Sequence, residues 1–347
     1  MTHKKWICIF LSIVIFMLSA FGGLTYLLDP LLQFHKESPI LTYYEYDEVY
    51  SNPGIAKQYD YDTILVGTSL IQNTDVQEFQ ELLYCDVVRL PYSGGTSCNM
   101  KTILDIGFSS HNTISYVYWE LNKHQLVMPA DEPVTPLPEY LYGKDSTHSL
   151  SYLLNLDIFY RFTFQNILKT MQGNIQGASR EGITFSGDFS KEGALSQYSR
   201  SEKTDTPYPE DYYLQVGQEN LDRNILPLVR ENPDTTFVFF MVPLSTLFWD
   251  YEIMHGTFDA TFRLYESILP QLLAYDNVEV HFLVDDWDIV TDLNHYKDYS
   301  HYSPEINAYI TRVLADRTEI LTKENVSSVL ENTKQYLSEY DYDSIFS

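Results

Sequence analysis

Short apolar runs, each bounded by polar or turn-forming residues, alternate with segments of helical periodicity between residues 61 and 317. Runs rich in Val, Ile, Phe and Tyr are typical of strands. They predict strands at Thr63–Val66, Val87–Leu90, Ser115–Tyr118, Phe237–Val242 and Val278–Leu283. Because strands that alternate with helices usually pair in parallel, the pattern predicts an α/β fold whose central parallel sheet is covered by helices on both faces, making three layers.

Helical periodicity predicts helices at Thr74–Leu83, Met100–Ile106, Ser303–Arg317 and Val326–Leu337. The alternation breaks down between Met128 and Tyr213. This stretch contains four closely spaced prolines, then a helix-like segment at Leu150–Met171, then a polar segment at residues 172–201. We interpret residues 129–213, approximately, as an insertion that forms a lid or a substrate-binding cap.

The most apolar part of the chain lies at its amino terminus. Lys4 and Lys5 precede an uncharged stretch, Trp6–Leu28, which as a helix would span about 30 Å, enough to cross a bilayer. The positive residues before it predict a single-pass anchor with the amino terminus inside and the remaining chain extracellular. A cleaved signal peptide is the alternative, although Ser19-Ala20-Phe21 is only a partial cleavage signal.

The predicted organisation therefore has four parts. Residues 1–28 form a cytoplasmic stub and the transmembrane anchor, and residues 29–58 form an extended juxtamembrane stem. Residues 59–320 form the α/β domain with its insertion, and residues 321–347 form a C-terminal helix and an acidic tail.

Composition narrows the possible functions. The chain of 347 residues has a formal net charge of −26, which argues against binding to nucleic acid or to anionic lipid. Cys85 and Cys98 allow one disulfide in the outer part. No Cys or His pairs have the spacing of metal ligands, so neither a metal nor a cofactor is expected.

Tyrosine is unusually frequent, with 29 residues. Two interpretations remain open. The tyrosines could serve tertiary packing and an exposed acidic tail at Tyr340-Asp-Tyr342. Alternatively, their flat faces and hydroxyls could line a groove that binds sugars.

The stretch Tyr61–Leu70 carries the first candidate for chemistry. Its strand-forming run stops at Gly67-Thr68-Ser69, which places the Ser69 hydroxyl at the carboxyl end of a strand, where open α/β sheets have their sites. Ser69 is the candidate nucleophile. A serine nucleophile requires a histidine base and a carboxylate that orients the histidine.

Asp298 and His301 are the candidates for these two roles. Asp145/His148 and Asp292/His295 have the same spacing, but only His301 is followed directly by a helix start, Ser303-Pro304-Glu305. A short loop that enters a core helix holds an imidazole in a fixed position. We therefore predict a catalytic set of Ser69, Asp298 and His301.

These motifs together resemble the SGNH (GDSL-like) hydrolase superfamily over about residues 60–317. Its second sequence block resembles residues 89–96, where Gly94 has the position of an oxyanion donor and Arg89 replaces the usual leading Asn. The third block resembles residues 120–123, with Asn122 at the position of another donor but without the usual glycine and second acid. The resemblance implies an oxyanion site of Ser69, Gly94 and Asn122, although Asn122 also suits a cap at the end of a strand.

An anchored chain with these motifs resembles the SGNH-like proteins of cell-surface polysaccharide O-acetylation and teichoic-acid D-alanylation. That resemblance implies a serine acyl-esterase or O-acyltransferase that acts on a cell-surface glycan or teichoic acid, with a membrane-bound O-acyltransferase as a candidate partner. Two alternatives stay open. One is an exported esterase or deacetylase that uses water, and the other is a catalytically silent scaffold or glycan-binding protein.

Overall fold

The computed structural model describes residues 3–38, 41–43, 47–110, 112–143, 146–173 and 184–346. Within these residues the centre is a six-stranded sheet with the order β2-β1-β3-β4-β5-β6. The strands are β1 (Thr63–Gly67), β2 (Val87–Pro91), β3 (Tyr116–Glu120), β4 (Thr236–Met241), β5 (Val278–Phe282) and β6 (Ile320–Leu321). The first five pair in parallel, and β6 runs antiparallel to β5. The protein is therefore an α/β protein with a mostly parallel sheet, as the sequence predicted.

The predicted strands lie within two residues of the observed ones at each end. The largest difference is at β3, which extends to Glu120 and so brings this carboxyl group to the end of the sheet. The sequence did not predict β6, because two residues are too few to show a period.

Helices cover both faces of the sheet. Phe79 of α3 (Val76–Leu83) lies against Tyr118, with ring centroids 5.1 Å apart. Gly107 of α4 (Ser97–Phe108) approaches Ile64 so closely that a Cβ would lie 2.7 Å from its Cδ1. Because Tyr118 pairs with Leu65, Tyr118 and Ile64 point to opposite faces. The helices α3 and α4 thus form two different outer layers, and α16 (Pro304–Asp316) packs beside α3.

The other elements around the sheet complete these layers. They are α5 (Lys123–Val127), α11 (Leu214–Asn220), η3 (Leu221–Ile225), α12 (Leu226–Glu231), α13 (Thr246–Met254), α14 (Phe258–Leu272), α15 (Trp287–Val290), η4 (Leu293–His295), α17 (Val326–Glu339) and η5 (Tyr342–Phe346). The C-terminal tail differs from the expectation of an exposed segment. Tyr342 and Ile345 in η5 are buried, because they pack on the main core.

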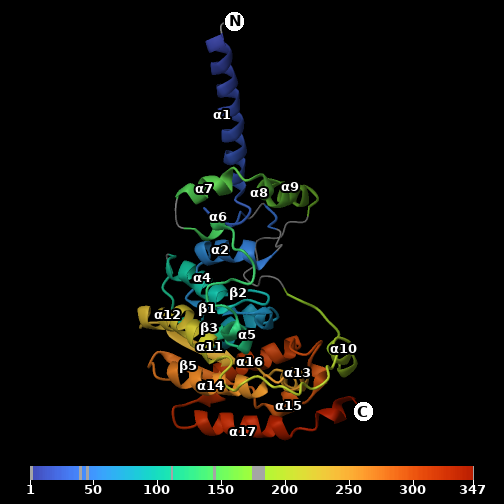
Figure 1. Ribbon diagram of the computed structural model, residues 1–347. Coiled ribbons are helices and arrows are strands. Elements are labelled where there is room, and N and C mark those ends of the chain that lie inside the picture. Colours follow the sequence, from blue (N-terminus) through green and yellow to red (C-terminus); the bar gives the residue numbers. More distant parts are fainter. Residues whose placement is uncertain are drawn as a thin grey trace.

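The amino-terminal helix α1 (His3–Leu28) is long and apolar enough to cross a bilayer. It projects away from the domain, and α7, α8 and α9 lie around its base (Figure 1). Most of its side chains are exposed, but Gly22 and Thr25 near its carboxyl end are buried. The ring of Phe21 lies 4.7 Å from that of Phe159, so the base of α1 is packed against the folded domain.

Residues 29–58 are not a simple extended stem. They include α2 (Glu48–Gln58), which begins at an Asp47 cap whose side chain accepts a hydrogen bond from the N–H of Val49. Asn52 in α2 donates to the carbonyl of Pro91 at the end of β2. The extended prediction was wrong here, because tertiary packing overrides the weak helix propensity of a segment that contains proline and glycine. Tyr44, Glu45 and Tyr46 of the predicted stem lie outside the described residues.

The single helix expected at Leu150–Met171 is divided, and residues 129–213 contain several short helical elements. These are α6 (Glu139–Tyr142), α7 (Ser146–Leu153), α8 (Leu156–Ile158), the π-helical turn η2 (Phe159–Thr163), α9 (Phe164–Met171) and α10 (Lys191–Ser196). The side chain of Asn155 breaks the helix, because it accepts hydrogen bonds from the N–H groups of Asp157 and Ile158 and starts a new one. In α7, before this break, the Tyr152 hydroxyl donates a hydrogen bond to the carboxylate of Asp29 at the end of α1.

Candidate active site

Ser69 lies in the turn that follows β1. The strand ends at Gly67, where a Cβ would lie 2.7 Å from the Cβ of Glu120, so a larger residue would not fit without rearrangement. Thr68 then caps the short 3₁₀ turn η1 (Ser69–Ile71), whose first residue is Ser69. Because β1 and β3 flank the point where the strand order reverses, Ser69 lies at the switch point where ligands bind in open α/β sheets.

Asp298 and His301 lie on a narrow loop between η4 and α16. The loop is closed by a bridge between Tyr296 and Tyr302 and by a hydrogen bond from the N–H of Lys297 to the carbonyl of His301. It is also tied to the end of β4, because the Tyr296 hydroxyl donates to the carbonyl of Pro243. These contacts bring a segment distant in sequence to the same edge of the sheet as Ser69.

The structure brings the three predicted catalytic side chains together. The Oγ of Ser69 lies 2.8 Å from the Nε2 of His301. The Nδ1 of His301 lies 2.8 Å from the Oδ2 of Asp298 and 3.1 Å from its Oδ1. This is the arrangement in which an imidazole can take the serine proton while a carboxylate holds the ring and stabilises the imidazolium.

The environment of Asp298 keeps it ionised. Burial by itself raises the pKa of Asp298. The hydrogen bond and charge of His301, together with the N–H groups of His301 and Ser300, oppose this and bring the pKa to about 2. Asp298 therefore offers a fixed negative charge to His301 at any pH near neutrality.

The other Asp/His pairs differ from this one. His295 lies 3.8 Å from Asp292, and both side chains are about one-third exposed or more, at 34% and 45%. Such a separation between exposed groups gives little orientation. The Asp145/His148 pair lies outside the described residues, since Asp145 and the His148 side chain are not described.

The predicted oxyanion donors also line the site. Gly94 adopts a φ of +62°, a conformation that glycine tolerates best, and its carbonyl lies 3.0 Å from the Nε2 of His124. Among the described residues, none accepts a hydrogen bond from the N–H of Ser69 or of Gly94. Both N–H groups therefore fit the role of donors to a developing oxyanion.

Asn122 has a structural role in addition to its place in the site. Its Oδ1 caps α5 by accepting from the N–H of Gln125. Its Nδ2 donates to the Oε1 of Glu120 at 2.8 Å and lies 3.4 Å from the Oγ1 of Thr68. Asn122 is thus a cap at the end of a strand, and its amide already has partners in this conformation.

Glu120 is a site residue that the sequence analysis did not single out. Its fully buried carboxyl accepts hydrogen bonds from both the N–H and the hydroxyl of Thr68, each at 2.9 Å. Desolvation raises the pKa of Glu120, and these hydrogen bonds together with that of Asn122 oppose the rise. Glu120 therefore fixes the residue that precedes Ser69. Its place in the third sequence block was the one signal that could have identified it.

Arg89, the first residue of the segment that resembles the second sequence block, is buried and does not line the cavity over Ser69. Its Nη1 donates to the carbonyl of Thr74 at 2.6 Å. This contact supports the segment that follows η1, so Arg89 belongs to the scaffold around Ser69.

Phe185 is a second site residue that the sequence did not reveal. Its ring meets the His301 ring edge-on, with centroids 5.1 Å apart, and the Nζ of Lys297 lies 4.1 Å from its centroid. Asn73 positions Phe185 by exchanging two hydrogen bonds of 3.0 Å with its backbone. The segment before α10 thus contributes a side chain that packs on His301. No local pattern signals this contact, because the two rings are far apart in sequence.

A cavity of about 270 Å³ opens over Ser69 and His301, and Gly94, Asn122 and Lys123 also line it.

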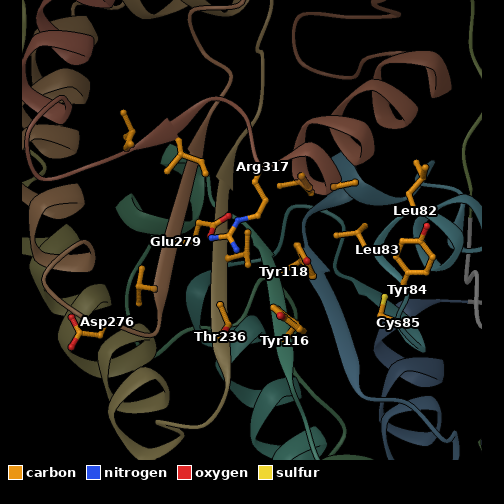
Figure 2. A pocket seen from close by; sticks show the side chains of 16 residues that line it. Leu82, Leu83, Tyr84, Cys85, Tyr116, Tyr118, Thr236, Asp276, Glu279 and Arg317 are labelled. Atoms are coloured by element: carbon orange, nitrogen blue, oxygen red, sulfur yellow. The ribbon is translucent and has the colours of Figure 1, made fainter.

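A separate hollow of about 550 Å³ lies at the amino ends of the strands, beside Tyr116, Thr236 and Asp276 (Figure 2). Cys85 lines that hollow as a free thiol, and burial raises its pKa to about 11, so it is not a nucleophile. Cys98 is also free, and the allowed disulfide is not formed.

Comparisons with known proteins add little to this geometry. No protein-family model and no curated protein matches the chain. A solved structure from Streptococcus pneumonia, whose description names a platelet activating factor, is similar over 78% of this chain and 90% of that chain, with 11% identity and a TM-score of 0.41. A match at this level identifies neither the substrate nor the site residues, which rest on the contacts described above.

Proposed function

We propose that this protein is a membrane-anchored serine acyl-esterase or acyltransferase of the SGNH type that works outside the cell on a glycan or teichoic acid. The observation that carries the proposal is the continuous hydrogen-bonded series from Ser69 through His301 to Asp298, with 2.8 Å at both links. Serine, histidine and aspartate in this order suit the attack of a hydroxyl on an ester carbonyl.

The first half of the reaction forms an acyl-serine. His301 takes the Ser69 proton on Nε2 while the Oγ bonds to the carbonyl carbon of the ester, and the carbonyl π electrons move to the oxygen. The N–H groups of Ser69 and Gly94 stabilise this oxyanion, and Asp298 stabilises the imidazolium. The oxyanion then collapses, the C–O bond of the leaving group breaks, and His301 returns its proton to the departing oxygen.

The second half releases the acyl group to an acceptor. A hydroxyl of water or of a polymer gives its proton to His301 and attacks the acyl-serine carbonyl. Collapse of the second tetrahedral intermediate frees the Oγ of Ser69, which regains its proton. The acceptor alone decides between hydrolysis and transfer, and a membrane-bound O-acyltransferase would be a suitable supplier of the acyl donor.

The packing of α1 supports a retained anchor over a cleaved signal peptide. Gly22 lies where a Cβ would be 3.2 Å from Leu154, and the N–H groups of Gln33, Phe34 and His35 donate to Asp29 just after the helix. Cleavage after Ala20 would divide this helix and leave its packed residues Phe21 and Gly22 at a new amino terminus. A continuous helix that is packed into the domain at one end favours a tether that stays in place.

Labelling with a fluorophosphonate probe tests the catalytic proposal. The full-length protein in detergent should form a covalent adduct at Ser69, since the probe reacts with an activated serine. Ser69→Ala and His301→Ala should both abolish labelling, whereas His295→Ala should leave it unchanged. Absence of labelling in the folded wild-type protein would support the catalytically silent scaffold instead.

A further inference from the structure

A second, larger cavity of about 840 Å³ continues from the catalytic cavity. The two share lining residues, among them Lys123, Phe248 and Tyr299. We call the larger cavity the tyrosine groove, after the aromatic residues that line it: Tyr208, Tyr212, Tyr213, Phe248, Tyr251 and Tyr299. A polymer in this groove would therefore lead directly to Ser69.

Four of the five described tyrosines that line the groove are open to solvent, since Tyr208, Tyr212, Tyr251 and Tyr299 are 40–51% exposed. Each combines a flat apolar ring with a hydroxyl, which matches a pyranose ring with its C–H faces and its rim of hydroxyls. One face of the Tyr251 ring is already stacked on His255, with centroids 3.8 Å apart, so a sugar would use the other face. The arrangement fits a sugar chain better than an acyl chain, which has no hydrogen-bond partners for the tyrosine hydroxyls.

The wall of the groove is already formed without a ligand. The N–H of Thr204 donates to the carbonyl of Met254, and that of Tyr208 donates to the carbonyl of Gly256, both at 2.9 Å. Gly256 has a φ of +71° and lies where a Cβ would be 2.6 Å from Pro207. Segment 201–213 is thus held tightly against the end of α13, and little order has to be gained on binding.

The charge of the groove distinguishes between the two acceptors of the proposed function. Among the described side chains that line it, Lys123 is the one ammonium or guanidinium group, and its Nζ lies 2.6 and 2.7 Å from the carboxylate oxygens of Glu252. Glu202 adds a further negative charge. A polymer of phosphodiesters would meet no unpaired cation there, whereas an uncharged sugar chain needs none.

We propose that the tyrosine groove is the acceptor subsite for an uncharged polysaccharide, whose pyranose rings stack on Tyr212, Tyr251 and Tyr299. This deepens the proposed function and rests on it for the acceptor role, because transfer requires an acyl-Ser69. A sugar hydroxyl that enters the shared region beside Tyr299 takes the place of water, gives its proton to His301 and accepts the acyl group. A teichoic acid is the disfavoured acceptor.

Binding to the full-length Ser69→Ala protein tests the assignment without turnover. The ligands are a panel of uncharged hexasaccharides, with β-1,4-gluco, β-1,4-manno and β-1,3-gluco linkages, and a poly(glycerol phosphate), each measured by calorimetry. A hexasaccharide should bind and the polyphosphate should not. Tyr212→Ala and Tyr251→Ala should each weaken binding about tenfold, equivalent to about 1.4 kcal/mol. Tyr84→Ala, which removes a 93% exposed tyrosine outside the groove, is the matched control.

Binding of the polyphosphate with loss in the same two variants would overturn the choice of ligand, and no binding by any hexasaccharide would overturn the subsite. Fluorophosphonate labelling of the wild type separates these failures from failure of the proposed function. A labelled serine with no sugar binding rejects the subsite alone. Sugar binding without labelling rejects the acceptor role, and leaves a glycan-binding protein.

A separate observation concerns the helices at the base of α1. Besides Tyr160, five large side chains without a polar group are exposed between residues 150 and 171, namely Leu150, Leu154, Leu156, Phe164 and Met171, with Leu156 at 62% and Met171 at 79%. We call this set the apolar collar. Leu150 belongs to α7, Leu156 to α8, and Phe164 and Met171 to α9, and these three helices lie at the base of α1, the helix suited to a bilayer (Figure 1).

We infer that the apolar collar rests in the surface of the bilayer that α1 crosses. Burial of exposed aliphatic side chains in the acyl-chain boundary is favourable at about 25 cal/mol per Å². The contact of Phe159 with Phe21 fixes the collar relative to α1. The inference rests on the proposed anchor, and the occupant is lipid because the exposed set continues directly from the lipid-facing helix.

Single-cysteine variants of the full-length protein in nanodiscs test the collar. A polarity-sensitive nitrobenzoxadiazole label is attached at native Cys8, at Leu156→Cys or at Ser338→Cys, with the other cysteines changed to serine. Lipids with brominated acyl chains should quench the label at 8 and 156, and not at 338 on α17. Quenching at 8 without quenching at 156 would reject the collar alone. Absence of quenching at 8 would reject the anchor.

Discussion

The side chains at the carboxyl edge of the sheet are polar and hydrogen-bonded, whereas those at the base of α1 are apolar and exposed. At the edge, Ser69, His301 and Asp298 each have a polar partner at 2.8 Å, and Glu120 accepts three hydrogen bonds of 2.8–2.9 Å from Thr68 and Asn122. At the base of α1, the side chains of the apolar collar are large and exposed. The function of the carboxyl edge depends on the direction of each hydrogen bond, and that of the apolar collar depends on the apolar area it can bury.

This difference indicates that chemistry and attachment can be separated. A hydrogen-bonded relay loses its function when one atom is removed, since each group acts through the next. An apolar surface loses its function gradually, because burial of area is non-directional and roughly additive. Changes at the carboxyl edge should therefore give large effects on turnover and none on attachment, and changes at α1 should give the reverse.

Ser69→Ala should have the largest effect. Removal of the nucleophile should lower kcat for an activated acyl ester on the order of 10⁴-fold or more, while the fold and membrane association stay intact. Turnover by the purified protein measures the chemistry of the carboxyl edge, and sedimentation with membranes measures attachment through α1. Undiminished hydrolysis by the variant would place the nucleophile elsewhere.

His301→Ala should be about as damaging as Ser69→Ala, and the double variant should be little worse, because the two groups act as a unit. His295→Ala is the matched control. Its ring has a longer and more exposed contact with its aspartate, so its loss should change kcat less than about tenfold. Steady-state kinetics of the four variants shows which histidine is the base. An essential His295 with a dispensable His301 would move the base to the Asp292/His295 pair.

Asp298→Asn should have an intermediate effect, with kcat lowered on the order of 10³–10⁴-fold. The pKa of Asp298 is about 2, so the wild-type carboxylate stays ionised from pH 4 to 9. Protonation of Asp298 should therefore not lower kcat/KM anywhere between pH 4 and 9. Steady-state kinetics of the variant measures the loss, and an Asp298→Asn protein that keeps the wild-type kcat would contradict this role of Asp298.

Removal of α1 should have the smallest effect on chemistry. A chain that begins at Asp29 and is secreted freely should hydrolyse a small ester within about twofold of the full-length rate, because every catalytic contact lies beyond residue 60. It should nevertheless fail to restore surface modification in a deletion strain. Full restoration by the released domain would show that the tether is not needed. Protection of the domain from protease in intact cells would overturn the proposed topology.

The sequence determined those features that depend on neighbouring residues. Period and turn residues predicted five strands and an apolar span, and a helix start behind His301 distinguished it from the other histidines of the same spacing. The glycine at the end of the first strand indicated Ser69 as the candidate nucleophile. These signals are local because hydrogen-bond geometry and side-chain direction repeat along the chain with a fixed period.

The tertiary structure decided the contacts that bring distant segments together. Phe185 packs on His301, Glu120 holds Thr68, and the side chains of segment 201–213 join those of α13 in the tyrosine groove. It also turned residues Glu48–Gln58 into a buried helix and divided Leu150–Met171 at Asn155. None of these follows from a local pattern, because each depends on which surface a segment meets once the sheet has formed, and that choice is made by burial and by partners far away in sequence.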